Sequence, residues 1–185
     1  VVGKFWATPV SPTAGGVTFS SGVMQVSTGI STTCAIKYGG AVYCWGSNIS
    51  NILGNSALTV NTNYTVPQET TRAAALGLSN TGATRVSVGQ QHACIIQGGF
   101  IYCAGYGGYS QLLNGTNANN TTYVKFANGN TFWANGGFTD MAISGNSTCF
   151  IQNGGVRCVG YAGNYLNGTT NTSISDGKLV FNEDL

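Results

Sequence analysis

The chain has 185 residues, of which 42% are hydrophobic and only 6% are charged, and its formal net charge at pH 7 is +2. This length and apolar content allow one folded domain of ordinary size. The seven basic residues do not cluster, which argues against binding to nucleic acid or to an anionic membrane, and no apolar stretch is long enough to be inserted across a bilayer.

A motif that occurs three times organises the rest of the sequence. The copies begin at Val23, Thr84 and Thr139, and each holds two cysteines on either side of a glycine turn. A period of roughly 50 to 60 residues is too long for ankyrin or leucine-rich repeats and is typical of a propeller blade. We therefore expect a single repeat domain over 1–185, divided into an N-terminal strand segment and three blade repeats: 1–22, 23–83, 84–138 and 139–185.

Each repeat predicts four antiparallel strands in chain order. The first is an alternating stretch that ends before a glycine, at Gly29, Gly89 and Gly145. The second and third form the cysteine hairpin, and the third closes at a further glycine, at Gly46, Gly105 and Gly160. The fourth is expected from the apolar segments 64–66, 123–126 and 179–181.

The two cysteines of each repeat are predicted to lie opposite each other. In the first repeat they flank a three-residue loop, Tyr38-Gly39-Gly40, and in the other two they are symmetric about the turns Gly98-Gly99 and Asn153-Gly154. Such turns connect the two strands of a hairpin. Counting residue pairs outward from the turn places the cysteines at non-hydrogen-bonded positions, where side chains come closest. The predicted disulfides are Cys34–Cys44, Cys94–Cys103 and Cys149–Cys158.

Metal or cofactor binding is not expected. The cysteine spacings are not those of zinc sites, and His92 is the only histidine in the chain. His92 occupies the repeat position that Thr32 and Ser147 fill in the other copies, which favours a structural role over that of a catalytic base.

Enzymatic activity is not expected either. The acidic residues are few, and no nucleophile motif is present. A glycosidase that joins distant carboxylates such as Glu69 and Asp140 is the remaining enzymatic alternative.

The paired cysteines predict an oxidising compartment, so we expect a secreted or cell-surface protein. Asparagine glycosylation motifs agree with this location, although a sequence rich in Asn, Ser and Thr produces such motifs by chance. The candidate acceptors are Asn48, Asn63, Asn114, Asn119, Asn120, Asn146, Asn167 and Asn171.

Several aromatic residues follow the hairpins, close to the predicted loops. They are Trp45, Tyr106, Tyr109, Tyr161 and Tyr165. Aromatic rings can stack on sugars, or they can pack within the core and between blades or subunits. The sequence favours packing or subunit contact over a glycan site.

The segments VSVGQQHACII, GGFIYCAG and AVYCWGSNISNILG resemble the β-propeller repeat of the regulator of chromosome condensation family. The resemblance covers nearly all of residues 23–170, and it implies an all-β fold of propeller-like blades. Propellers of this family usually close with about seven blades, whereas three cannot form a ring, so we expect a partial or intermolecularly completed propeller. The family's activities, including nucleotide exchange on a small GTPase and inhibition of β-lactamases, depend on variable loops and are not carried over.

The ends of the chain suggest how the blades are completed. Residues 1–10 resemble the late part of a repeat, and the last repeat ends with its own strand, so the chain is expected to begin and end within a period. Our first hypothesis is a secreted, non-enzymatic structural protein that binds copies of itself head to tail in an extracellular filament, tube or sheath. The alternative is an extracellular propeller for a protein or glycan ligand, closed by oligomerisation or belonging to a longer propeller.

Overall fold

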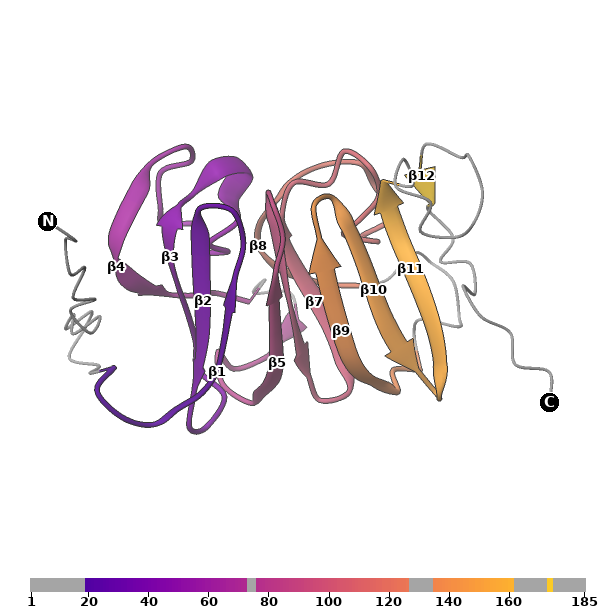
Figure 1. Cartoon of the computed structure of the whole chain (residues 1–185), viewed down its shortest axis with the longest axis horizontal. Helices are drawn as coiled ribbons and strands as arrows, with labels where there is room; N and C mark the ends of the chain where they lie inside the picture. Colours follow the sequence, from indigo (N-terminus) through magenta and orange to yellow (C-terminus); the bar gives the residue numbers. More distant parts are fainter. Residues whose placement is uncertain (1–18, 73–75, 127–134, 162–172, 175–185) are drawn as a thin grey trace, which may run out of the picture.

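The computed structural model describes residues 19–72, 76–126, 135–161 and 173–174. These residues form three four-stranded antiparallel sheets, which follow one another along the longest axis of the molecule in chain order (Figure 1). We call them blades 1, 2 and 3. The expected all-β, propeller-like fold is thus observed, with blades that do not close a ring within the described residues.

The strands of each blade are connected in sequence order. Blade 1 contains β1 (Val23–Thr28), β2 (Thr32–Lys37), β3 (Val42–Ser47) and β4 (Asn63–Glu69), with the short 3₁₀ helix η1 (Ile49–Asn51) between the last two. Blade 2 contains β5 (Ala83–Val88), β6 (His92–Gln97), β7 (Phe100–Gly105) and β8 (Asn120–Lys125). Blade 3 contains β9 (Phe138–Ser144), β10 (Ser147–Gln152), β11 (Gly155–Tyr161) and β12 (Ser173–Ile174).

The hairpin turns have the predicted lengths. The turns Gly98-Gly99 and Asn153-Gly154 have positive φ angles at both residues, as a type I′ turn requires. In blade 1 the N–H of Lys37 donates to the carbonyl of Ala41 over 2.9 Å, which leaves the three-residue loop between them. Turn chemistry therefore determines the hairpin register in all three blades.

The fourth strand is predicted correctly in two of the three blades. The segment 64–66 lies in β4, and the segment 123–126 lies in β8 except for its last residue, Phe126. In blade 3 the fourth strand is β12, which pairs with Gly160 and Tyr161 of β11. The expected segment 179–181 lies outside the described residues, as does most of the N-terminal segment 1–22.

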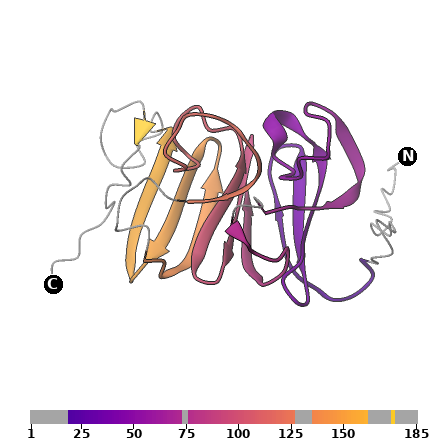
Figure 2. The same ribbon diagram turned by 180° about the vertical axis from the view of Figure 1, so that it is seen from behind.

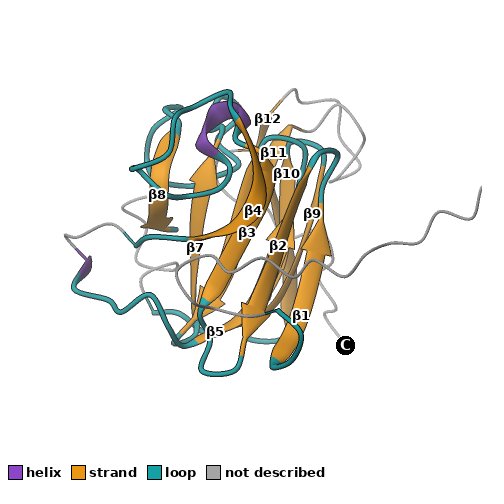
Figure 3. Ribbon diagram, turned by 90° about the vertical axis from the view of Figure 1, so that its left-hand side faces the viewer, coloured by secondary structure: helices purple, strands orange, loops and turns teal. Residues whose placement is uncertain are grey.

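The core lies between the blades rather than within them. Strand β5 packs against β1 and β2, and β9 packs against β5 and β6, so the first strand of each blade contacts the blade before it. Figure 3 looks along the stack and shows the sheets one behind another. Side chains alternate between the two faces of a strand, so each blade contributes one face to each neighbouring interface.

The described residues contain no helix of the length and apolarity needed to cross a membrane.

Candidate functional site

All six cysteines form disulfides within their own hairpins, in the pairs that the turn register predicts. The bonds are Cys34–Cys44, Cys94–Cys103 and Cys149–Cys158, with Cα–Cα distances of 4.1, 4.1 and 4.0 Å. Each pair lies directly opposite across two neighbouring strands. The short distances suit non-hydrogen-bonded positions.

Each disulfide lies on the side of its blade that faces the following blade, and we call this side the disulfide face. Alternation along the strands places apolar residues two positions from the cysteines on the same face. On blades 1 and 2 this face is covered completely. The residues that are at most 2% exposed there are Cys34, Ile36, Val42, Cys44, Cys94, Ile96, Ile101 and Cys103.

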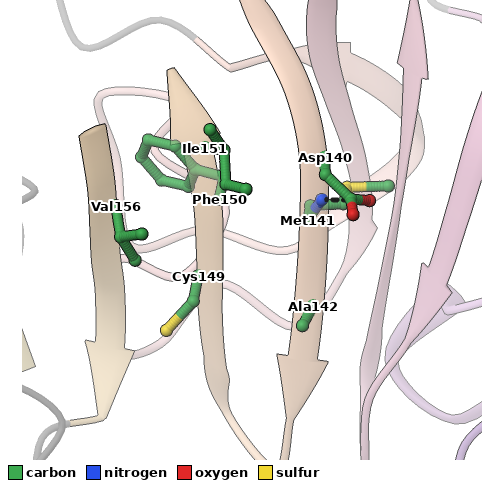
Figure 4. Close-up of a pocket in the computed structure, with 7 residues that line it drawn as sticks. All are labelled: Asp140, Met141, Ala142, Cys149, Phe150, Ile151 and Val156. Atoms are coloured by element: carbon green, nitrogen blue, oxygen red, sulfur yellow. Dashed lines mark hydrogen bonds between the residues drawn. The ribbon is translucent and has the colours of Figure 1, made fainter. Parts of the chain in front are cut away.

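The disulfide face of blade 3 is uncovered in the described part of the chain. Cys149, Ile151 and Val156 are each partly exposed, and Ala142 is exposed. Together with their neighbours they line a hollow of about 240 Å³ (Figure 4). The lining residues are Asp140, Met141, Ala142, Cys149, Phe150, Ile151 and Val156. An apolar surface that is buried in two blades thus faces outward in the third.

At the other end of the stack lies the face of blade 1 that is opposite to its disulfide face. Val26 on this face is 60% exposed. Phe19 packs edge-on against the rings of Tyr43 and Trp45, with centroid distances of 5.2 and 6.0 Å. Trp45, one of the expected contact aromatics, therefore lies on an end face and packs within the chain.

Serine hydroxyls join the blades along their first strands. Ser27 of β1 accepts a hydrogen bond of 3.1 Å from the N–H of Val88, and Ser87 of β5 accepts one of 3.0 Å from the N–H of Ile143. Both serines lie opposite the first cysteine of their blade, and Ala142 holds that position in blade 3. A blade that covered blade 3 would therefore make a more apolar contact.

Three of the aromatic residues predicted to make ligand or subunit contacts pack against one another. They are Tyr106, Tyr109 and Tyr161, and we call them the tyrosine cluster. The ring centroids of Tyr106 and Tyr109 are 5.8 Å apart, and those of Tyr109 and Tyr161 are 4.9 Å apart. The first two residues follow β7, and the third ends β11, so the cluster bridges blades 2 and 3. Tyr165 lies outside the described residues.

His92 is buried at the junction between blades 2 and 3, beside the tyrosine cluster. It links the two blades. Its Nε2 lies 2.8 Å from the Thr148 hydroxyl, which donates its own hydrogen to the carbonyl of Gln111 over 3.2 Å. Because that hydrogen is used, His92 Nε2 is the donor in the first contact. Burial lowers the pKa of His92 to about 3, so the ring is neutral. These contacts give His92 a structural role.

The carboxylates considered for glycosidase chemistry lie on different blades. Glu69 ends β4 in blade 1, whereas Asp140 is in β9 of blade 3 and lies 3.5 Å from Arg85 in an ion pair. Among the described residues, no group of three or more His, Cys, Asp and Glu side chains could hold a metal ion.

The candidate glycosylation sites differ in accessibility. Asn48 is only 1% exposed; its side-chain amide donates to Thr59 and accepts from the N–H of Leu53. A glycan on Asn48 does not fit this fold, which corrects the expectation for that residue. Among the others, Asn63 and Asn119 are exposed, and the partly buried ones are Asn114, Asn120 and Asn146. Asn167 and Asn171 lie outside the described residues.

The position of the disulfides between blades was not predicted from the sequence. A signal was present, because a cysteine and an isoleucine stand two positions apart in every repeat: Cys34 and Ile36, Cys94 and Ile96, Cys149 and Ile151. Gln111 was not predicted either, because its role depends on contacts distant in sequence.

Comparison with known proteins agrees with this architecture. Two family models of the regulator of chromosome condensation (RCC1) repeat match residues 23–51 and 39–96. No curated protein matches the sequence. The structure of human WBSCR16 is similar with a TM-score of 0.71 and 17% identity, over 88% of this chain and 40% of that one.

Two yeast structures are similar to the same extent. Prp20p from Saccharomyces cerevisiae, described with its binding to Gsp1p and histones, has a TM-score of 0.70 and 14% identity, over 88% of this chain and 39% of that one. Yeast RCC1 (Prp20), solved with Kap60, has a TM-score of 0.68 and 15% identity, over 88% of this chain and 37% of that one.

The fold is that of a partial β-propeller, and residues 23–96 match the repeat of the regulator of chromosome condensation type. It spans about 40% of the length of the first solved structure that it matches.

Proposed function

We propose that this chain is a secreted, non-enzymatic propeller module whose end faces are covered by the blades of neighbouring copies, head to tail. The observation that carries the proposal is the uncovered disulfide face of blade 3. Its counterparts on blades 1 and 2 are at most 2% exposed at their cysteines and are buried against a following blade. Burial of apolar area is the main stabilising term in such contacts.

The two end faces of the stack, on blade 3 and on blade 1, are the two kinds of face that meet between neighbouring blades. Between blades 1 and 2, a disulfide face meets the opposite face of the next blade, which carries the buried Tyr102. Blade 1 carries the same opposite face at the other end of the stack, where Val26 is 60% exposed and Tyr43, at the position equivalent to Tyr102, is buried beneath Phe19. A second copy of blade 1 therefore fits the disulfide face of blade 3, and repetition builds a ring or a filament, tube or sheath.

Three disulfides support an extracellular location, since such bonds persist in oxidising compartments. The low charge supports close self-association, because little repulsion between like charges opposes it.

Light scattering coupled to size-exclusion chromatography tests the proposal across micromolar concentrations. We expect the mass to rise above 19.1 kDa with concentration. Val156→Lys places a charge on the uncovered face and should return the protein to the monomer. The matched control is Val66→Lys on β4, where the valine is 42% exposed, and it should assemble as the parent does. A monomer at every concentration would refute head-to-tail assembly.

A second candidate is that further blades of one longer polypeptide cover the same faces, giving a propeller that binds a protein or glycan ligand. The observation that favours it is the coverage of the solved structures, which contain the matched region within chains more than twice its length. The mass of the reduced protein isolated from its source separates the two candidates. A value far above 19.1 kDa supports the longer propeller.

A further inference from the structure

The tyrosine cluster lies where two blades meet at the loop end of the stack. Tyr106 and Tyr109 belong to the connection between β7 and β8, and Tyr161 is the last residue of β11. Figures 1 and 2 both show this connection at the same end of the molecule as the end of β11. Tyr106 and Tyr109 are partly exposed and Tyr161 is 36% exposed, so the rings are accessible from this end.

A buried polar side chain lies next to the cluster. Gln111 is 0% exposed, and its Oε1 accepts a hydrogen bond of 2.8 Å from the N–H of Tyr109. Its Nε2 has no hydrogen-bond partner among the described residues. Buried amide groups are normally paired, so this donor is an unsatisfied polar group in the interior beside the cluster.

A second polar group lies next to Tyr161. The backbone carbonyl of Asn146 accepts a hydrogen bond of 3.0 Å from the N–H of Tyr161, and the side-chain Oδ1 of Asn146 is buried without a partner in the described part of the chain. Tyr109 and Tyr161 are therefore each accompanied by a polar side-chain atom, one donor and one acceptor.

The loop is electrically neutral. No Asp, Glu, Lys, Arg or His occurs between Gly105 and Asn120 or between Ser144 and Thr148. Its polar groups are hydroxyls and amides, including Ser110, Asn117 and Asn119, which are partly or fully exposed. A phosphate, a sulfate or a nucleic acid would find no opposite charge here, whereas a ligand rich in hydroxyl groups would find matching partners.

We propose that the tyrosine cluster is a binding site for a neutral carbohydrate. A pyranose ring has an apolar C–H face that stacks on Tyr109 or Tyr161, while its hydroxyls pair with amide groups at the rim. The site lies within the described blades, so it does not depend on how the end faces are covered.

A microarray of neutral and charged glycans tests the assignment, followed by calorimetric titration with the strongest neutral oligosaccharide. We expect binding to neutral glycans, with an affinity that falls at least about tenfold in Tyr161→Ala and in Tyr109→Ala. The matched control is Tyr38→Ala, because Tyr38 is 75% exposed in the β2–β3 loop at the other end of the blades. It should change the affinity less than about twofold.

Several results would overturn the site. They are binding of charged glycans alone, no neutral glycan bound, or an equal loss of affinity in Tyr38→Ala and Tyr161→Ala. If the alanine variants do not fold, chemical-shift changes of the tyrosine ring carbons in the parent protein decide instead. Shifts at Tyr109 and Tyr161 on titration with the same oligosaccharide support the site, and their absence refutes it.

Discussion

The carbonyl oxygen of Gly145 lies so close to Gly89 that a Cβ on Gly89 would come within 2.8 Å of it. The same Cβ would lie 2.5 Å from the Cγ2 of Ile143, and the N–H of Gln90 donates to Gly145 over 3.0 Å. A side chain at Gly89 therefore separates blades 2 and 3. A Cβ at Gly29 would meet Gly89 in the same way at the junction of blades 1 and 2.

Gly89→Ala should lower the free energy of unfolding by about 3 kcal/mol, because the backbone oxygen opposite the new methyl group cannot move aside. Urea denaturation measures the change. The control is Gly98→Ala, at a turn with positive φ and no atom within 4 Å of an added Cβ, which should cost only about 1 kcal/mol. Equal costs would contradict the close approach.

The neutral, buried His92 predicts a loss of stability in acid. Its pKa is lowered to about 3 by burial in the folded state, against 6.5 as the ordinary value. The unfolded chain therefore binds the additional proton, and stability falls as the pH decreases from about 6.5 towards 3, by on the order of 5 kcal/mol in the limit.

The variant His92→Thr carries the residue of the same position in blade 1 and isolates this effect. Denaturation at pH 7 and pH 4 should show a smaller difference for the variant than for the parent protein. Parallel losses in the two proteins would show that His92 does not contribute to the acid sensitivity.

The three disulfides should differ in their reactivity towards reductant. Cys149 is partly exposed on the uncovered face of blade 3, whereas the cysteines of blades 1 and 2 are all 0% exposed. Thiol–disulfide exchange requires access to a sulfur, so Cys149–Cys158 should be reduced first. Alkylation during graded reduction of the native protein, read by mass spectrometry, identifies the first pair. Equal rates in dilute, monomeric protein would contradict the exposure of this face.

Arg72 should be important for joining blades 1 and 2. It is 6% exposed, its Nε donates to Gln97 over 2.9 Å and its Nη1 to Thr70 over 2.8 Å, and its guanidinium carbon lies 5.4 Å from the ring centroid of Tyr123. Lysine cannot reproduce this planar arrangement. Arg72→Lys should therefore lower the free energy of unfolding by about 2 kcal/mol.

Chemical denaturation measures this loss, and Arg85→Lys is the control. The Arg85 side chain is 50% exposed and pairs with Asp140 at the surface. Its replacement should change stability by less than about 0.5 kcal/mol. An Arg72 variant as stable as this control would show that the buried contacts are dispensable.

The hairpins were predictable from the sequence because their causes are local. Asn153-Gly154 adopts the positive φ angles that a two-residue turn needs, and the turn alone places Cys149 opposite Cys158. The repeat period and the four strands expected in each copy predicted the blade architecture, and the resemblance to a known repeat agreed with it. Neither source of information required contacts between repeats.

The contacts between blades were not predictable in the same way. The side-chain amide of Gln25 bonds to both the N–H and the carbonyl of Val86, which is 61 residues away, and no turn or spacing in the sequence indicates such a pair. Arg72 was missed because neither of the other repeats supplies an equivalent signal. Tertiary pairing, rather than local propensity, determines these features.

The disulfides also bear on how the chain acquires its structure. The bonded cysteines are only 9 or 10 residues apart, and each pair is brought together by the turn of its own hairpin. Closure of a loop of this size takes roughly 10–100 ns, and hairpins form in roughly 1–10 μs. Oxidation can therefore follow each hairpin as it leaves the ribosome or translocon, before any blade docks. The chain needs no search among the 15 possible connectivities of six cysteines.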